Sequence, residues 1–433
     1  MIKSKQHCQV LVIGAGAAGI TAAYFLAQAG VDVVLLERGP YPGSKNMSGG
    51  AVYSLPTREF LPDFWQEAPV ERALRDHQFW LMTETSAIKL GFTSVDFVNP
   101  PYNRFSVMRA TFDRWYADKA VQAGACLWTE CKAESLLLDG KKVIGAHISG
   151  NRSGHIHADI VILAQGANPI LAEKAGLIKK PKAANYSLYV KEMLYLPREV
   201  ISERFQLKDN EGTVIGLLGD NTAGLVGTGS LYTFKEHIGL NTGVGVKTLA
   251  DKKVNISDLM ARLKRHYVIE PLIRGGTTVE YLAHLIPEGG YNAVPRLVFD
   301  GMMITGDAAG LVNGTHGLNL AMYSGKFAAD TAIKALEECK FTGEALNHYR
   351  ERLEGSFVLK DMWDNRKIPG WFAKNPTLFD DYITLFNQAA FQVTMVHPVS
   401  RREKRRVIRK AILAARPAGK LLVDALQGIR VVK

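Results

Sequence analysis

Three glycines and one acid near the N-terminus have the types and the order of residues that bind a dinucleotide. Gly14, Gly16 and Gly19 follow an apolar run and open an apolar helical pattern, and Glu37 ends the next apolar run. In such a unit the glycines allow a tight turn, a close approach to a pyrophosphate and close helix packing, while the first helical N–H groups face the phosphate. Glu37 would accept hydrogen bonds from ribose hydroxyls. The pattern predicts a dinucleotide-binding βαβ unit over 9–38 and favours a cofactor-driven oxidoreductase.

A second glycine and acid turn lies far along the chain, at Gly306 and Asp307. An apolar strand pattern precedes it and Ala-Ala-Gly follows it. The first unit alone suits either a nicotinamide or a flavin dinucleotide. A tightly held FAD is contacted at both ends, so Asp307 would accept the ribityl hydroxyls while the backbone of Gly306 approaches the pyrophosphate. The pair of turns therefore favours FAD.

Other residues near these turns have roles that the sequence leaves partly open. The N–H groups of Gly317, Leu318 and Asn319 begin a long helical pattern over 318–340 and would stabilise negative charge on a reduced flavin ring. His316 could donate a proton, but a histidine between glycines is more often a structural hydrogen bonder, and it is assigned no role. Arg109 either contacts the FAD or anchors its own helix. Because a flavin needs no acid–base triad, no catalytic residue is assigned.

The elements that must position these residues follow from the apolar patterns. A short strand near Ser106 leads into a helix that stops at Gly124. Three segments, 126–131, 136–138 and 143–148, are expected to form a small antiparallel meander within 125–150. The apolar run 158–163 suits a return to the parallel sheet, and 297–304 reads as a strand pair before the second glycine turn.

This pattern predicts an α/β chain in several parts. The FAD-binding domain would comprise 1–182 and 298–345, interrupted by a mixed α+β second domain over 183–297 whose sheet covers one side of the cofactor. Residues 346–433 would form a helical, aromatic region that ends in a basic tail. The segments around 188–197, 213–219 and 224–234 are the expected strands of the second domain.

The formal charge of +11 is concentrated in the tail. Residues 401–433 contain eleven Lys or Arg against two acidic residues. Such a tail is a solvated face, a docking surface for a membrane or a protein, or, least favoured because no nucleic-acid module accompanies it, a nucleic-acid contact. Apolar residues form one helical stripe within it, which can rest on an anionic surface or dock an acidic redox partner: Val407, Ile408, Ala411, Ile412 and Ala415.

Hydropathy and cysteine content set further limits. The chain has no uninterrupted apolar run of about 18 residues that could span a bilayer, and its start runs directly into the first strand, so a cytoplasmic protein is expected. The four cysteines, Cys8, Cys126, Cys131 and Cys339, lack the close spacing of an iron–sulfur ligand set. No metal ligand is assigned.

Taken together, the motifs resemble those of FAD-dependent oxidoreductases of the electron-transfer-flavoprotein:quinone oxidoreductase group, most closely the FixC-type members. The resemblance spans roughly 8–395 and implies a Rossmann-like, glutathione-reductase-like fold. It also implies that FAD accepts electrons from a reduced electron-transfer flavoprotein and passes them to a membrane quinone. The matching segments are 14–19 with Glu37 and Arg38, 48–50, 109–113, 163–166, 229–232, 287–291, 306–310 and 314–319.

Larger members of that group carry a four-iron cluster at the C-terminus, and this chain lacks its cysteines. The resemblance therefore implies a separate ferredoxin-like iron–sulfur protein, with the chain bound peripherally at the inner face of the cytoplasmic membrane. The second-domain sheet and the turn 289–291 are the expected walls of a quinone site. The expected FAD-binding residues are Gly14, Gly16, Ala17, Ala18, Gly19, Glu37, Arg38, Ser48, Gly49, Gly50, Arg109, Lys132, Ala164, Gly166, Gly306, Asp307, Gly317, Leu318 and Asn319.

Two other functions remain open at this point. One is a geranylgeranyl-reductase-like or aromatic-hydroxylase-like flavoprotein, which would use the same FAD fold on an apolar substrate. The other is a non-enzymatic, flavin-carrying subunit that assembles a complex through its basic tail. One fold commonly hosts several functions, so the fold by itself does not separate these readings.

Overall fold

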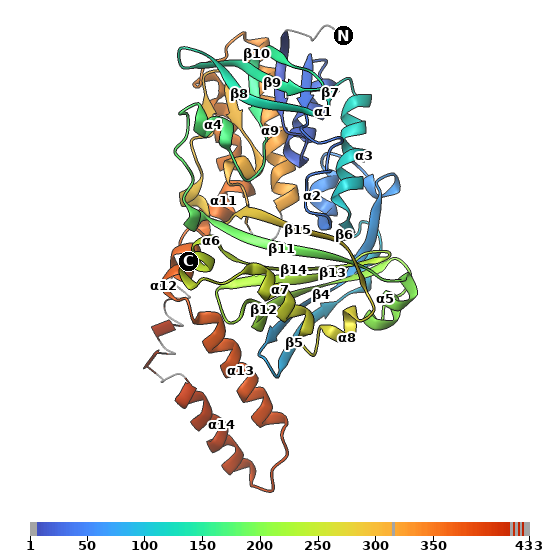
Figure 1. The fold of residues 1–433 in the computed structure, drawn as a ribbon, viewed down its shortest axis with the longest axis vertical. Coiled ribbons are helices and arrows are strands. Elements are labelled where there is room, and N and C mark those ends of the chain that lie inside the picture. The colour runs from blue at the N-terminus through green and yellow to red at the C-terminus, as the bar shows by residue number, and fades with distance from the viewer. Residues whose placement is uncertain (1–6, 314–316, 416–418, 421–422, 425–426, 428–433) are drawn as a thin grey trace. The chain divides into compact units, whose positions relative to one another are not determined.

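The computed structural model describes residues 7–313, 317–415, 419–420, 423–424 and 427 of the 433-residue chain (Figure 1). The chain divides into two compact units. Unit 1 comprises Met1–Val70, Val107–Asn185 and Leu285–Arg366. Unit 2 comprises Glu71–Ser106, Tyr186–His284 and Lys367–Lys433.

Unit 1 is built on a mostly parallel sheet whose central strands contain continuous apolar runs. The strand order is β16-β17-β10-β1-β2-β7, and only β16 runs antiparallel to its neighbour β17. Strands buried on both faces are expected to be apolar throughout, and β2 is buried at every position. The strands are β1 (His7–Ile13), β2 (Val33–Leu36), β7 (Cys126–Trp128), β10 (Gly154–Leu163), β16 (Val298–Phe299) and β17 (Met302–Ile304).

Three helices of unit 1 pack closely together. Helix α1 (Ala17–Gln28) contacts both α3 (Arg109–Gln122) and α9 (Gly317–Glu337). The contact with α3 includes a buried hydrogen bond from the Tyr116 hydroxyl to Thr21 Oγ1 at 3.0 Å. The expected strand, helix and strand order over 9–38 and the long helix after the second glycine turn are confirmed.

The antiparallel meander exists, but its strands differ from those expected. Cys126–Trp128 does not belong to it, because β7 pairs in parallel with β2 and extends the main sheet. The meander consists of β8 (Cys131–Asp139), β9 (Lys142–Gly150) and the first residues of β10. The expectation that 126–131 forms one meander strand is therefore wrong. A break at residues 129 and 130, where Glu130 has a positive φ of 52°, separates the two strands.

Unit 2 carries the second sheet, in the order β15-β11-β14-β13-β12-β4-β6, with β5 paired to β4. Its core includes Val190 on β11, Leu240 on β14, and Leu259 and Leu263 on helix α7 (Ile256–Arg265). The strands are β4 (Val70–Met82), β5 (Ala87–Thr93), β6 (Arg104–Val107), β11 (Tyr186–Tyr195), β12 (Glu211–Gly219), β13 (Gly227–Thr233), β14 (His237–Gly245) and β15 (Thr277–Pro287).

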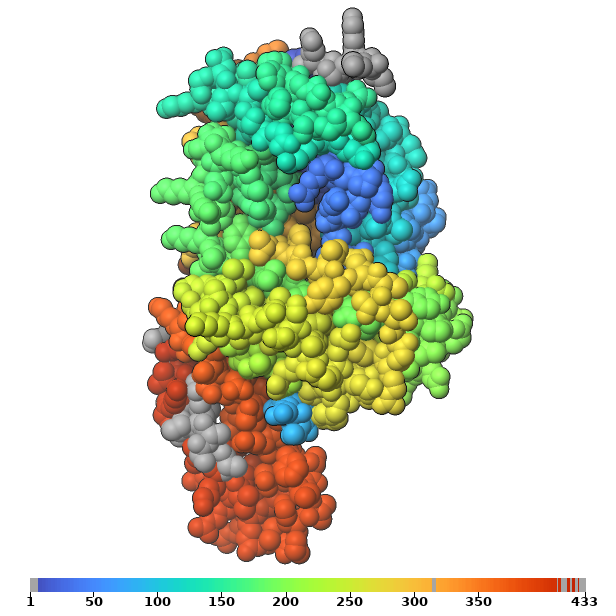
Figure 2. Space-filling model, viewed as in Figure 1, coloured from blue at the N-terminus to red at the C-terminus, as the bar shows by residue number. Residues whose placement is uncertain are grey.

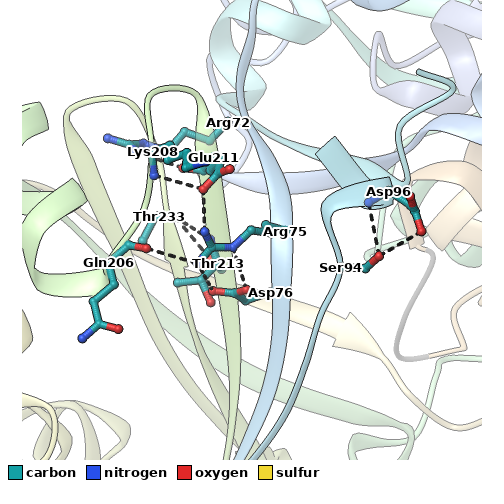
Figure 3. Close-up of polar contacts among 10 residues, drawn as sticks. All are labelled: Arg72, Arg75, Asp76, Ser94, Asp96, Gln206, Lys208, Glu211, Thr213 and Thr233. Atoms are coloured by element: carbon teal, nitrogen blue, oxygen red, sulfur yellow. Dashed lines mark hydrogen bonds and ion pairs between the residues drawn. The ribbon is translucent and has the colours of Figure 1, made fainter. Parts of the chain in front are cut away.

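Strand β4 is held in this sheet by buried charge. Arg72 is 1% exposed, and its guanidinium donates to the carbonyls of Phe234 at 2.6 Å and Glu211 at 3.0 Å. Figure 3 shows Arg75 lying between Asp76 and Glu211, with Nη1 2.6 Å from the Glu211 carboxylate. A buried guanidinium is tolerated only where its donors are satisfied. These bonds tie β4 to β12 and to the turn after β13.

The remaining elements are mostly short helices around the two sheets. None of the helices within the described residues is both long and apolar enough to cross a bilayer. The remaining elements are the short strand β3 (Gly50–Tyr53) and the helices α2 (Ser54–Arg58), α4 (Ile170–Lys174), α5 (Arg198–Phe205), α6 (Val246–Lys252), α8 (Glu270–Ile273), α10 (His348–Gly355), α11 (Phe357–Asp364), α12 (Ile368–Lys374), α13 (Leu378–Thr394) and α14 (Arg401–Ala415).

The two units differ from the domains expected from the sequence at residues 71–106 and 346–433, and also at 183–185 and 285–297, which were expected in the second domain and belong to unit 1. Residues 71–106 cluster with unit 2, although the sequence placed them in the first part of the FAD-binding domain. The helical region expected over 346–433 is shared, with 346–366 in unit 1 and 367–433 in unit 2. The first difference arises because β4 and β5 pair with each other and β4 also pairs with β12.

The contact between α1 and α9 predicts a sharp sensitivity at Gly325. A Cβ added there would lie 2.1 Å from the carbonyl oxygen of Ala18, which is backbone and cannot move alone. We expect Gly325→Ala to lower the free energy of unfolding by at least about 2 kcal/mol. Denaturant unfolding followed by circular dichroism measures this change.

Gly355→Ala is the matched control, because nothing lies within 4 Å of a Cβ at the end of α10. We expect it to change stability by less than about 0.5 kcal/mol. Equal stability of the two variants would contradict the close crossing of the helices.

Candidate cofactor-binding site

The first glycine turn has the geometry that its residue types predict. Gly14 has a φ of +106°, and a Cβ there would lie 2.4 Å from the carbonyl oxygen of Ala164. A Cβ on Gly19 would lie 1.9 Å from the carbonyl oxygen of Gly14, whereas nothing lies within 4 Å of a Cβ on Gly16. Gly14 therefore lets the turn approach the backbone that follows β10, and Gly19 lets α1 approach the backbone of Gly14. Gly16 leaves open space beside the backbone.

The N-terminus of α1 is open to an anion. Its N-cap, Gly16, has no side chain to bond the helix, and no acid lies in the first turn. The first N–H groups of a helix, here those of Ala17, Ala18 and Gly19, have no partner within the helix. Aligned peptide dipoles add positive potential at this end. A pyrophosphate is the kind of group that such a terminus binds.

Glu37 is buried at the end of β2 and is fixed by two backbone donors. Its Oε2 accepts from Ala15 N at 3.2 Å and its Oε1 from Gly39 N at 2.6 Å. Burial raises the pKa of Glu37, although these two hydrogen bonds and the charge of Arg38 oppose the shift. The carboxylate is thus held beside the first glycine turn, and Arg38 lies exposed next to it.

Two buried polar atoms beside this turn have no hydrogen-bond partner among the described residues. They are Ser44 Oγ and Gln165 Oε1. A Cβ on Gly39 would lie 2.2 Å from Ser44 Oγ and 3.1 Å from Glu37 Oε1. The hydroxyl and the carboxylate therefore lie on the same side of Gly39. Since buried polar groups are normally satisfied, these atoms fit a polar ligand held between the glycine turn and Glu37.

The second glycine turn is brought against the first helix. Gly306 begins a short 3-10 turn over Gly306–Ala309, and a Cβ on it would lie 3.0 Å from the Cβ of Ala18. Its N–H donates to Ser324 Oγ on α9 at 2.9 Å. Asp307 follows at a half-buried position. The two glycine and acid turns, far apart in the chain, therefore lie on either side of the start of α1.

Arg109 anchors its helix through an ion pair with Asp113. Its Nε and Nη2 lie 2.8 and 2.7 Å from the two carboxylate oxygens, and Asn46 Nδ2 donates to the same carboxylate at 2.7 Å. Burial disfavours the charge of Arg109, but Asp113 and, more weakly, Asp307 outweigh it and raise its pKa. Of the two roles left open by the sequence, anchoring is observed, and the charge of Asp307 connects Arg109 to the second turn.

The remaining expected residues lie in three places. Ser48, Gly49 and Gly50 lie at the junction of the loop with β3, and a Cβ on Gly50 would lie 3.9 Å from Arg109 Cδ. Gly166 follows β10 with a φ of +79°. Lys132 is on β8, whose Cys131 N–H donates to the carbonyl of Glu37 at 2.9 Å, but its side chain pairs with Glu134 at 2.7 Å.

The start of α9 presents the N–H groups of Gly317, Leu318 and Asn319 as its first turn. The Asn319 side chain is used structurally, because Oδ1 accepts from Tyr53 N at 3.1 Å and Nδ2 donates to Thr57 Oγ1 at 2.8 Å. His316 and the two residues before it lie outside the described residues.

Sequence reasoning missed several contributors to this site. Ser44, Asn46, Asp113 and Ser324 all contact or support the two turns. Ser44 and Asn46 lie in the polar loop that follows Glu37, which was the one available signal. Asp113 ends the matching segment 109–113 but was assigned no role of its own, and the role of Ser324 depends on its contact with the distant Gly306.

Comparison with known families and proteins agrees with this geometry. A model described as "FAD dependent oxidoreductase" matches residues 9–97, and one described as "ETF-QO/FixC family C-terminal domain" matches residues 368–433. Protein FixC of Azotobacter vinelandii is 40% identical over 431 residues, which cover 99% of this chain and 100% of the relative. Protein FixC of Escherichia coli (strain K12) is 39% identical, covering 88% of each chain.

Solved structures share the fold at lower identity. A geranylgeranyl bacteriochlorophyll reductase-like protein from Thermoplasma acidophilum superimposes with a TM-score of 0.73 at 20% identity, covering 98% of this chain and 99% of that one. The myxobacterial chondrochloren halogenase CndH, a variant of FAD-dependent halogenases, gives 0.64 at 17% identity, covering 96% and 91%. These likenesses confirm the Rossmann-type α/β fold. The match to the FAD-dependent oxidoreductase family model identifies FAD as the cofactor.

The buried position of Glu37 predicts a pH dependence of FAD binding. Glu37 must be ionised to accept ribose hydroxyls as well as backbone N–H groups, and its raised pKa makes protonation begin at a higher pH than for an ordinary carboxyl group. We expect FAD affinity to fall as the pH is lowered from 8 to 5. The folding stability of the apoprotein depends on pH in the opposite direction. Glu37 favours the folded state at low pH, and this contribution is lost as the pH rises through its folded pKa.

Titration of FAD into the apoprotein, followed by flavin fluorescence, measures the affinity, and denaturant unfolding of the apoprotein at each pH measures its stability. We expect Glu37→Gln to weaken binding at pH 8 by roughly 1.5–3 kcal/mol and to flatten the pH dependence. Glu134→Gln, on the exposed strand β8, should change neither. An unaltered pH profile in Glu37→Gln would remove Glu37 from the site.

Proposed function

The chain belongs to the ETF-QO/FixC family of FAD-dependent oxidoreductases, and on that basis we propose that it accepts electrons from a reduced electron-transfer flavoprotein and delivers them to a membrane quinone. The observation that carries the proposal is the identity of about two residues in five with FixC proteins over nearly the whole chain. The cofactor-binding geometry of unit 1 supports it, because the turns and the acids needed for FAD lie together.

Bound FAD supplies the redox chemistry, since a flavin takes up two electrons and releases them singly. The chain's own residues bind and orient it in this proposal. The first turn of α1 holds the pyrophosphate, Glu37 holds the adenosine ribose, and Asp307 holds the ribityl chain. The first N–H groups of α9 would stabilise negative charge on the reduced ring. Arg109 keeps the loop and α3 in place through Asp113.

Unit 2 supplies an apolar surface suited to a quinone. Phe79 on β4 lies directly opposite Leu90 on β5, and His77 opposite Phe92. All three apolar side chains are about half exposed or more, with Phe92 at 62%. The Phe79 ring packs over Gly216 of β12, where a Cβ would come within 2.8 Å of it. A contiguous exposed apolar patch of this kind commonly marks a binding surface, and a quinone with an isoprenoid tail needs one.

The proposal includes a separate iron–sulfur protein and a peripheral position at the inner face of the cytoplasmic membrane. Its support is the family resemblance, in which a ferredoxin-like protein takes the place of the C-terminal cluster domain. Within the described ranges, no three His, Cys, Asp or Glu side chains are grouped to hold a metal ion.

The geranylgeranyl-reductase-like alternative rests on fold alone. The Thermoplasma acidophilum structure shares only 20% of its residues with this chain, a level at which fold and function separate. The two functions predict different electron donors and acceptors, so one experiment distinguishes them.

We expect the FAD of the purified holoprotein to be reduced by a reduced electron-transfer flavoprotein and reoxidised by a soluble quinone analogue. Stopped-flow absorbance of the flavin band measures both half-reactions. NADH or NADPH without the partner should reduce it far more slowly. Rapid reduction by NAD(P)H alone, or reduction of an alkene substrate without a protein partner, would overturn the proposal.

The apolar surface of unit 2 predicts which step a mutation there affects. We expect Leu90→Ser with Phe92→Ser to raise the KM for quinone by at least roughly tenfold, or about 1.4 kcal/mol. The reason is that a ligand covers only the exposed part of each side chain, and full burial of one such side chain contributes about 1.5–3 kcal/mol. The rate of flavin reduction by the partner should stay unchanged. Leu138→Ser, at a similarly exposed position on β8, is the control. A loss confined to flavin reduction would assign this surface to the protein partner instead.

A further inference from the structure

Helices α13 and α14 form a hairpin in unit 2 that the proposed electron transfer does not use. The two helices contact each other and run in opposite directions, joined by residues 395–400 (Figure 1). Asn387 anchors α13, because its Nδ2 donates to the Leu81 carbonyl at 3.1 Å and its Oδ1 accepts from Ser86 Oγ at 2.8 Å. Figure 2 shows side chains of this red hairpin on the visible surface.

The end of the hairpin is apolar, uncharged and exposed. Residues 382–400 contain no Asp, Glu, Lys or Arg. Five apolar side chains near the connection are between about half exposed and, for Val396, 89% exposed. Isolated apolar side chains on a surface are ordinary, but a cluster within nine residues is not. They are Phe391, Val393, Met395, Val396 and Val399.

Helix α14 places a dense positive charge directly beside this end. It carries seven Lys or Arg and one acid, Glu403. That acid caps its own helix, because its carboxylate accepts from the N–H and the hydroxyl of Ser400 at 2.9 and 2.8 Å. Lys404 Nζ donates to the carbonyls of Val393 and Met395 and so closes the hairpin. Most of the other cations face outward and are exposed.

A groove on α14 combines the two chemistries. It has a volume of about 460 Å³ and is lined by Ile408, Ile412 and Leu413 together with Arg405 and Arg409. The apolar side chains suit a hydrocarbon chain, and the two guanidiniums suit a phosphate, which arginine binds well. The lining therefore fits an amphiphile with an anionic head group.

We infer that the α13–α14 hairpin docks on a bilayer that contains anionic phospholipid. The uncharged end, residues 391–399, enters the boundary between head groups and acyl chains, and the cations of α14 bind the phosphates, as in other interfacial helices. An acidic protein would match the charge of α14, but it would leave no reason for Val396 and its neighbours to be exposed. The inference deepens the proposed function, on which it rests for the presence of a membrane substrate.

Flotation of the full-length holoprotein with vesicles tests the inference. We expect binding to vesicles of phosphatidylcholine mixed with phosphatidylglycerol and at least tenfold weaker binding to phosphatidylcholine alone. Raising the salt from about 0.1 M to about 0.5 M should weaken the binding, because salt screens exposed charges. Arg405→Glu with Arg409→Glu should lower the bound-to-free ratio by about tenfold or more, and Val396→Asp should lower it independently.

Two matched controls have the same charge changes away from the hairpin. Lys179→Glu with Lys180→Glu lies in unit 1, and Val279→Asp lies at an exposed position on β15. Neither should alter vesicle binding, and the visible flavin spectrum reports that each variant is folded. Binding to neither kind of vesicle, or equal binding by the hairpin variants and the wild type, would overturn the inference.

If the hairpin binds an acidic protein instead of a bilayer, the same variants give a different result. Arg405→Glu with Arg409→Glu would then abolish complex formation with the electron-transfer flavoprotein while leaving vesicle binding unchanged, which would also overturn the inference. Flavin reduction by that partner is measured without vesicles. If it fails while vesicle binding persists, the proposed function falls and the docking surface stands.

Discussion

The whole of unit 1 depends on a close approach between backbones, which only glycine permits because it has no side chain. Helix α9 crosses α1 at Gly325, against the carbonyl of Ala18, while Gly19 and Gly14 let α1 sit tightly on the turn and on β10. This crossing brings Gly306 against Ala18, so that two turns nearly three hundred residues apart share the start of one helix. Overpacking at such a contact displaces both backbones, and the cofactor site would be displaced with them.

Buried charged groups also hold separate segments together, through hydrogen bonds. Glu37 is held by backbone donors, and Arg109, Asp113 and Asn46 form one bonded group that joins α3 to the loop after β2. These buried charges are paired or hydrogen-bonded, as the cost of burying them requires. Arg72 follows the same rule in unit 2, where carbonyl oxygens rather than acids satisfy it. Buried polar groups thus position both units.

The comparisons separate what is general in this chain from what is particular. The flavoprotein fold is shared with a reductase-like protein and a halogenase at 20% identity or less, so the fold alone specifies no reaction. The match to FixC proteins extends over nearly the whole chain. Family-specific chemistry must then reside in the surfaces of the common fold rather than in its architecture. Those of unit 2, the apolar pair of strands β4 and β5 and the charged hairpin, are the features on which the proposed electron route and docking depend.

Local pattern was enough to establish the flavin-binding fold, because the residues of the βαβ unit and of the strand pair before Gly306 are contiguous and their glycines and acids have fixed spacing. It also located the long helix and three strands of the second sheet, β11, β12 and β13. The local pattern did not predict strand β4, because the charges of Arg72, Arg75 and Asp76 are typical of an exposed segment. In the folded chain, backbone carbonyls and Glu211 satisfy the two arginines. The parallel pairing of β7 and the hydrogen bond from Asn46 to Asp113 were likewise decided by contacts between distant segments. Such contacts leave no periodic trace in a single sequence, and so only the folded chain reveals them.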